Sequence, residues 1–465
     1  MNHPHWRLCL ILLCTTQFVA LLDFSITMIP LPQIQQSLGF TPGGLQWVVN
    51  AYGVAIAGFL LLGGRAADLF GRRRMFLIGL VLFTVGSLVG GFSQTPAMLI
   101  ATRAMQGLGA AMFSPAAFSL LLAVFSDPQQ RNRALGAWTA VAASGFVAGL
   151  ILGGIITDVM GWRWVLWINV PVGVLVIALS NVLPIGKPNA QNASGRLDVW
   201  GAVLVASGSA TLVFAFANSE HVGLASFTTF GLILLAVALL AAFIYVESQV
   251  ESPLMPLPVF WRRSTGGANL VSLLANTALG PTFVVVALYM QAVLGFTATQ
   301  TGLGLLPMAA AFTLSSAWAG PMLMARLGTK PVILAGLTLF IGGLAMLGTS
   351  LSADASWGTS ILPGTLLAGI GYGVAFPAWT AAGIEEVDAA DHGLAGGMLT
   401  TTQEVGSAVG LAVGVAVSIA VLASGGNAVQ GFSYAILISA FMVLAGLVCA
   451  IAILPGHASR LGVAR

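Results

Sequence analysis

The chain has 465 residues, of which 58 % are hydrophobic and 7 % are charged, with a formal net charge of +3. A typical soluble domain carries roughly a quarter charged residues, and a soluble chain of this length could not bury so much apolar surface. The composition therefore excludes a water-soluble enzyme. The 17 Lys and Arg residues are spread through short loops instead of clustering on one face, so no nucleic-acid binding is expected.

Fourteen apolar segments succeed one another along the chain, each long enough to cross a bilayer as a helix. The first has no small-residue cleavage site and continues past Asp23, so we expect a helix and not a removed signal peptide. We predict an all-α polytopic membrane protein with fourteen transmembrane helices. The segments are residues 7–30, 44–66, 75–93, 97–125, 133–157, 162–184, 197–217, 224–247, 267–294, 300–326, 331–351, 357–381, 395–423 and 430–454.

The basic residues are distributed unequally between the two sides of such a bundle. With both termini in the cytoplasm, fifteen of the 17 Lys and Arg residues lie on the cytoplasmic side. Arg163 lies outside and Arg103 lies within a span. Because cytoplasmic loops are enriched in Lys and Arg, this bias predicts cytoplasmic termini and also supports the number of helices.

An internal repeat relates the two ends of the chain. Gln106–Ala116 in the fourth segment resembles Ala368–Ala378 in the twelfth at an offset of 262 residues. Glycines of the fifth and thirteenth segments repeat at an offset of 261, and the loops after the second and tenth segments repeat at 257. We predict a six-helix half at 1–185, a linker with two inserted helices at 186–250, and a second six-helix half at 251–465, as in many secondary transporters.

Two ionisable residues of opposite charge are predicted at matching depth. Asp23 lies roughly 10 Å and Arg103 about 9 Å from the outer surface at 1.5 Å per residue. Ionisable residues within spans are costly and mark functional sites by default. We hypothesise that Arg103 steadies the Asp23 carboxylate and that protonation or substrate changes this pairing. A static ion pair is the alternative, although apolar packing could replace such a pair at little cost.

Glu404 is a second acid within a span. It lies roughly 13 Å from the cytoplasmic surface, near the midplane. A carboxyl group at this depth has the environment of a proton carrier. The alternative is a protonated Glu that hydrogen-bonds across helices without a role in transport.

The loop after the second segment combines glycines with charge. Gly64 and Gly71 allow close approach and a tight turn, and Asp68 can pair with a cation or a helix N-terminus across the two halves. We therefore predict a cytoplasmic conformational gate of Gly64, Asp68, Gly71, Arg72 and Arg73. Topology-determining charge alone would explain the arginines but not the Asp or the glycine spacing.

Small residues recur every four positions in the fifth segment, at Gly145, Gly149 and Gly153, with Gly154 beside them. Such a stripe permits tight helix packing. Aromatic residues within spans are candidates to line a cavity for apolar or cationic ligands. These candidates are Phe18, Phe24, Trp47, Tyr52, Tyr289 and Trp379.

No motif for an energy-coupling enzyme is present in the sequence. The two lysines lie outside any phosphate-binding G-x-x-x-x-G-K-[ST] loop, and the histidines, cysteines and acids form no metal-ligand spacing. We therefore expect no metal and no cofactor. Transport must be driven by a gradient or be passive.

Six stretches of the chain together resemble the fourteen-helix drug:proton antiporters of the major facilitator superfamily. This type includes quaternary-ammonium and methylenomycin resistance exporters. The resemblance covers nearly the whole chain, with Leu150 where the antiporter motif has Pro and Ala66 and Leu69 in place of the usual Leu and Arg of the loop motif. The matching stretches are Leu22–Pro32, Trp47–Tyr52, Gly64–Arg74, Arg103–Ala111, Trp162–Pro171 and Gln403–Glu404.

The resemblance implies proton-coupled efflux of small amphipathic drugs or antibiotics across a bacterial cytoplasmic membrane. Asp23 and Glu404 would be sites of protonation or cation recognition, and Arg103 a proton-relay partner. The four glycines of the fifth segment would form the antiporter motif. The implied partners are the substrate, protons and membrane lipid, with the proton gradient as energy source and a monomer as the functional unit.

Two other functions stay open from the sequence. A proton symporter that imports a nutrient or siderophore would have the same architecture, and the glycines of the fifth segment favour export over it. A membrane sensor or scaffold that transports nothing would need a soluble signalling segment. The longest predicted loops, about 15–20 residues, are too short for a domain.

Overall fold

The computed structural model describes residues 6–125, 128–183, 198–223, 225–250, 262–387 and 392–455. Within these ranges the regular structure is helical, and fourteen helices are long and apolar enough to cross a membrane. This confirms the predicted all-α polytopic fold. The longer helices are α1 (Trp6–Ile26), α4 (Trp47–Phe70), α5 (Arg72–Gly91), α6 (Pro96–Val124), α7 (Pro128–Met160), α9 (Asn169–Leu179), α10 (Val199–Val222), α11 (Phe227–Gln249), α13 (Arg263–Ala292), α14 (Ala298–Leu314), α16 (Thr329–Ser350), α17 (Leu362–Glu385), α18 (His392–Ala423) and α19 (Ala428–Ile453).

Several shorter elements form parts of the membrane spans, and α2 connects the first span to the second. Two π-helical turns, η2 and η3, lead into α15 and α17. A 3₁₀ turn, η1, follows α9. The short elements are α2 (Leu31–Leu38), α3 (Pro42–Leu45), α8 (Arg163–Trp167), η1 (Ser180–Val182), η2 (Ser315–Ala319), α15 (Gly320–Leu327) and η3 (Trp357–Ile361).

The chain forms two compact units. Unit 1 consists of Met1–Ala210, Leu239–Leu254 and Thr297–Gly302, and unit 2 consists of the remaining segments: Thr211–Ala238, Met255–Phe296 and Leu303–Arg465. The predicted boundary at 185/186 falls outside the described residues, and the one at 250/251 borders the undescribed stretch 251–261. The predicted three-part division therefore stays a prediction.

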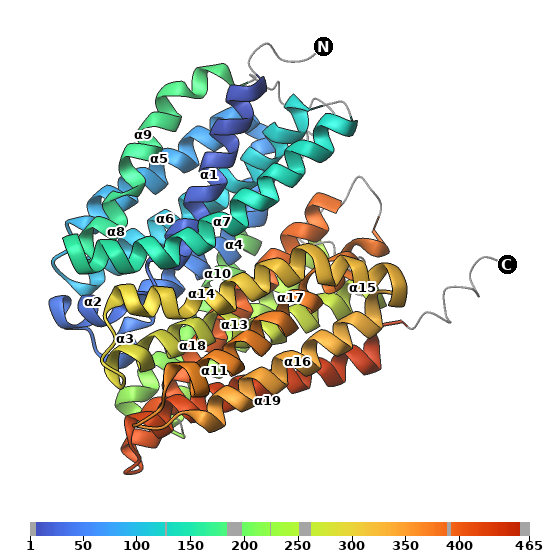
Figure 1. Ribbon diagram of the computed structural model, residues 1–465. Helices are drawn as coiled ribbons and strands as arrows, with labels where there is room; N and C mark the ends of the chain where they lie inside the picture. The colour runs from blue at the N-terminus through green and yellow to red at the C-terminus, as the bar shows by residue number, and fades with distance from the viewer. Residues whose placement is uncertain are drawn as a thin grey trace. The chain divides into compact units, whose positions relative to one another are not determined.

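Within unit 1, α6 packs against α4 and α5, and α1 packs lengthwise against α7 (Figure 1). A core of buried apolar side chains, among them Phe76, Phe83 and Phe113, joins these helices. Within unit 2, α17 packs against α16, and α13 packs against α18 and α19 (Figure 1). Each unit therefore has its own buried helix contacts.

The same close contacts recur in both units at the offset of the internal repeat. A Cβ added at Gly107 would collide with the backbone carbonyl of Tyr52, and one at Gly369 would collide with that of Met308. These pairs are offset by 262 and 256 residues. Likewise α6 and α17 contain internal prolines at positions offset by 262. In both units a glycine lets two backbones approach where a side chain would separate them.

The turns before α5 and α16 are also related by the repeat. Gly71 and Gly328 have φ of 100° and 83°, a conformation that glycine adopts without strain. Arg73 then donates to Asn181 Oδ1 at 2.8 Å. At the matching position Lys330 donates to the carbonyls of Ile451 and Leu454 at 2.8 and 2.7 Å, next to the end of α19. A basic side chain at a helix C-terminus stabilises it.

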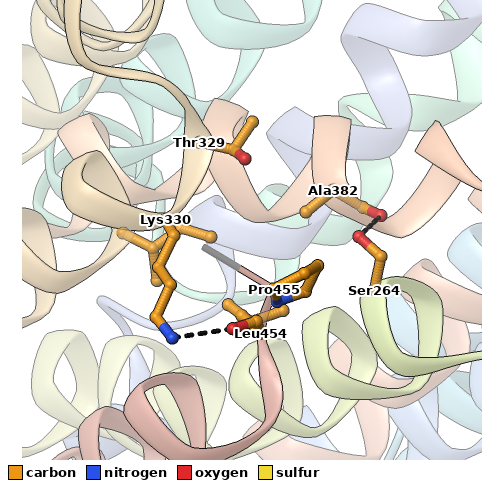
Figure 2. A pocket seen from close by; sticks show the side chains of 7 residues that line it. Ser264, Thr329, Lys330, Ala382, Leu454 and Pro455 are labelled. Atoms are coloured by element: carbon orange, nitrogen blue, oxygen red, sulfur yellow. Dashed lines mark hydrogen bonds between the residues drawn. The ribbon is translucent and has the colours of Figure 1, made fainter. Parts of the chain in front are cut away.

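Figure 2 shows the hydrogen bond from Lys330 to the carbonyl of Leu454 beside a small pocket. Ser264 at its rim donates to the carbonyl of Ala382 at 2.8 Å. None of the predicted transport residues lines this pocket, and the side chains of Ser264 and Lys330 are bonded to backbone carbonyls. We therefore interpret it as a packing feature. Its lining residues are Ser264, Thr329, Lys330, Ile333, Ala382, Leu454 and Pro455.

Candidate functional site

Asp23 and Arg103 form a buried ion pair in unit 1. Asp23 lies in α1 with 0 % of its surface exposed, and Arg103 lies in α6 with 1 % exposed. Arg103 Nη1 and Asp23 Oδ2 are 2.6 Å apart. The contact predicted from their matching depth is therefore present.

Arg103 has further acceptors around its guanidinium group. Its Nε donates to the carbonyl of Val48 at 2.9 Å, and its Nη1 also donates to Gln106 Oε1 at 2.9 Å. The guanidinium carbon lies 4.6 Å from the ring centroid of Tyr52, a cation–π geometry. These contacts fix the orientation of Arg103 independently of Asp23.

The other oxygen of Asp23 accepts hydrogen bonds from two amides. Asn169 Nδ2 donates to Oδ1 at 2.6 Å, and Gln106 Nε2 donates to the same atom at 3.1 Å. Gln106 Nε2 also donates to Ser87 Oγ at 2.8 Å. The carboxylate therefore has a cation on one oxygen and two neutral donors on the other. This is the satisfied environment that a buried charge requires.

Such a network can respond to a proton. A proton bound to Asp23 removes the negative charge that Arg103 neutralises, and turns one carboxyl oxygen from an acceptor into a donor. Hydrogen bonds to charged groups are about twice as strong as neutral ones. The pairing with Arg103 must therefore weaken when Asp23 is protonated.

Glu404 lies in α18 of unit 2 and its side chain is partly exposed. The described residues include no hydrogen-bond or ion-pair partner for it, and it lies within electrostatic range of Tyr372. Tyr372 is buried and donates to Asn276 Oδ1 at 3.0 Å. Its ring lies 5.1 Å from that of Trp379 and 5.3 Å from that of Phe312, measured between centroids. The second predicted acid thus lies close to an aromatic cluster.

The predicted gate loop runs from the end of α4 into α5. Asp68 Oδ1 lies 3.5 Å from Arg72 Nη2, with about a third of each side chain exposed. An ion pair this open to solvent contributes little stability. Arg72 also donates to the carbonyl of Ser119 at 3.4 Å. Gly64 faces Pro115 at ordinary contact distance. The proposed gating of these residues stays a prediction.

The glycine stripe of the fifth span positions α1. A Cβ added at Gly145 would lie 2.6 Å from the carbonyl oxygen of Phe18, and at Gly149 2.7 Å from that of Leu22. At Gly153 the distance to the carbonyl oxygen of Ile26 would be 2.9 Å. Successive turns of α7 thus contact successive turns of α1. The backbone on either side of Asp23 is held by these contacts.

Further along α7, the stripe contacts the first turn of α14, which belongs to unit 1. A Cβ at Gly154 would lie 2.6 Å from the carbonyl oxygen of Ala298. One turn later, the Asp158 carboxylate accepts hydrogen bonds from the backbone N–H groups of Ala298 and Thr299 at 3.2 and 2.8 Å. Asp158 therefore caps the N-terminus of α14.

Comparison with known proteins decides the family. The family described as Major Facilitator Superfamily matches residues 13–410. This chain belongs to the Major Facilitator Superfamily. It is a multi-pass membrane transporter and not an enzyme, as the sequence predicts.

Relatives of this superfamily member include antibiotic exporters. It is 38 % identical to a cephamycin export protein of Amycolatopsis lactamdurans, over 86 % of this chain and 82 % of that protein. It is 35 % identical to a puromycin resistance protein of Streptomyces alboniger, over 87 % and 80 %. The methylenomycin A resistance protein of Streptomyces coelicolor is 31 % identical, over 85 % and 82 %.

Solved structures agree in fold. The POT family transporter PepTSo matches with a TM-score of 0.71 over 97 % of this chain and 98 % of that one, at 15 % identity. The nucleoside transporter NupG matches with a TM-score of 0.62 over 97 % and 99 %, at 16 % identity. At these identities the likeness shows the superfamily fold alone.

The aromatic candidates of this transporter have different surroundings. Tyr52 packs on Arg103, and Tyr289 is buried and donates to the carbonyl of Ser352 at 2.6 Å. Trp379 is fully buried, and Phe18 and Trp47 are partly exposed. The second pocket, an open apolar groove in unit 1, is lined by other residues: Leu88, Phe92, Trp164, Trp167, Val170 and Pro171. Cavity lining by the candidates stays a prediction.

Three polar residues of the network escaped the sequence reasoning as site residues. Gln106 lies one turn after Arg103 on the same face of α6, a spacing that places neighbours together. Asn169 is an isolated amide in an apolar span, and Ser87 is one of two buried hydroxyl residues in α5, one turn after Thr84. A search for neutral polar residues at the depth of Asp23 would have found Gln106 and Asn169.

Proposed function

We propose that this transporter exports small amphipathic antibiotics or drugs in exchange for protons, by alternating access. The observation that carries the proposal is the buried ion pair of Asp23 and Arg103, which supplies a titratable group inside the membrane. The relatives named for antibiotic export or resistance support the substrate class and direction.

The proposed cycle couples substrate and proton through mutually exclusive binding. A proton entering from outside binds Asp23 and weakens its pairing with Arg103. Release of that proton to the cytoplasm restores the ion pair. Glu404, beside the aromatic cluster of unit 2, is the second proposed site for a proton or a cationic substrate. Inward flow of protons down their gradient then drives the outward movement of drug.

The remaining features of the proposal rest on sequence and family. The protein would lie in a bacterial cytoplasmic membrane with both termini in the cytoplasm, as the distribution of Lys and Arg favours. It would act as a monomer surrounded by lipid. The proton gradient would replace any cofactor as the source of energy.

A growth-inhibition panel in a pump-deficient bacterial host tests this function. Cells that express the wild-type protein should tolerate higher concentrations of amphipathic antibiotics and accumulate less ethidium than cells without it. Asp23→Asn and Glu404→Gln should each abolish this advantage at equal expression. Asp354→Asn, at an exposed acid, is the matched control and should retain it. Tolerance that survives both substitutions, or increased ethidium uptake, would contradict the proposal.

A further inference from the structure

Asn169 makes an uneven set of contacts in the Asp23 network. It begins α9, has 1 % of its surface exposed, and donates through Nδ2 to Asp23 Oδ1 at 2.6 Å. Its own Oδ1 is buried and has no hydrogen-bond partner among the described residues. An amide oxygen left without a donor in such a place is destabilising, because its lost hydration is not replaced by a hydrogen bond. The structure therefore holds an unused acceptor next to the carboxyl group.

The second amide on Asp23 has no such freedom. Gln106 Oε1 accepts from Arg103 at 2.9 Å, and its Nε2 donates to Ser87 at 2.8 Å as well as to Asp23. Inverting this amide would place its oxygen beside Asp23 and its nitrogen beside the Arg103 donor. Both the oxygen and the nitrogen of the Gln106 amide thus have hydrogen-bond partners, whereas the Asn169 amide is bonded through its nitrogen alone among the described residues.

We propose that Asn169 is a positioning residue that inverts its side-chain amide when Asp23 gains or loses its proton. The inference rests on the proposed proton coupling through Asp23. With Asp23 ionised, Nδ2 of Asn169 donates to Oδ1, as observed. With Asp23 protonated on Oδ1, the new O–H donates to Oδ1 of Asn169 after the amide has rotated by half a turn.

The proton has a defined place in this scheme. Arg103 faces Oδ2 and carries donors alone, so it can never accept from a protonated Asp23. The proton therefore belongs on Oδ1, where the neutral amides lie. The inverted amide pairs its oxygen with the new hydroxyl, while its N–H groups move to the side that Oδ1 occupies in the ionised form. Asn169 thus stabilises both forms of Asp23, and its preference decides the pH at which they exchange.

Substitutions at Asn169 separate this role from mere packing. Asn169→Leu keeps the volume and removes both donor and acceptor. Because a hydrogen bond to a charged group is stronger than one to a neutral group, the carboxylate loses more than the acid. The midpoint of substrate-induced proton release should therefore move upward by about one pH unit.

Asn169→Asp is the isosteric second variant. Its carboxyl group can donate to Asp23 only when it holds a proton itself, so transport should be lost at neutral pH and return as the pH falls. The measurements are proton release on addition of ethidium to the purified full-length transporter and ethidium transport in proteoliposomes, each over a range of pH. Asn427→Asp, at an exposed helix cap where Asn and Asp serve equally, is the matched control with an unchanged profile.

The outcomes distinguish the two proposals. If Asp23→Asn keeps wild-type proton release, the proposed function of Asp23 fails. If Asp23→Asn abolishes release while both Asn169 variants retain the wild-type midpoint, the role of Asn169 alone is refuted. Loss of activity at every pH in folded Asn169→Asp would also refute it, since a purely structural role produces that result.

Discussion

The ion pair of Asp23 and Arg103 should behave as one energetic unit. Removing either partner leaves an uncompensated charge at a position with 1 % exposure or less, a change that destabilises by about 3–5 kcal/mol. Arg103→Leu removes the cation from Asp23 and the donors from Val48 and Gln106. Asp23→Leu leaves Arg103 with those two acceptors and the Tyr52 ring. We expect the double variant to lose far less than the sum of the single losses.

Equilibrium unfolding of the four proteins in mixed micelles measures this coupling. Additive single losses would refute the account of the network.

Three further predictions concern helix contacts. Gly149→Ala should destabilise the protein by at least about 2 kcal/mol, because the added Cβ would collide with the α1 backbone. Gly136→Ala, whose Cβ would meet nothing within 4 Å, is the control and should be neutral or stabilise by up to about 1 kcal/mol. Equal thermal unfolding of the two variants would contradict this. Asp158→Ala should cost about 0.5–2 kcal/mol through the lost cap, and an unchanged melting temperature would argue against it. Lys330→Met should cost about 1 kcal/mol and speed hydrogen exchange at the end of α19, and unchanged exchange there would count against the C-terminal cap.

Periodicity and depth account for the features that could be predicted from the sequence. The fourteen helices are set by the length of apolar runs, and the pairing of Asp23 with Arg103 results from equal distances along two helices. Asn169 could not be assigned in this way, because a neutral amide carries no charge that demands a partner. Its role depends on the rotation of α9 about its own axis, which nearly uniform hydrophobicity leaves undetermined. The contact of the Tyr52 ring with Arg103 likewise could not be predicted, and its role as a cavity residue stays a prediction.

The repeat also shows which properties the two halves do not share. The contact of Gly149 with Leu22 corresponds to that of Gly410 with Thr277, so the counterpart of Asp23 is Ala278. By the offset of α6 and α17, the counterpart of Arg103 is Thr365. The repeat therefore preserves the close helix contacts, whereas the buried ion pair of unit 1 has no counterpart at Ala278 and Thr365. Placing an acid at position 278 and an arginine at position 365 would give each half its own buried ion pair. Selection for drug tolerance would then show whether such a protein still transports its substrate in one direction.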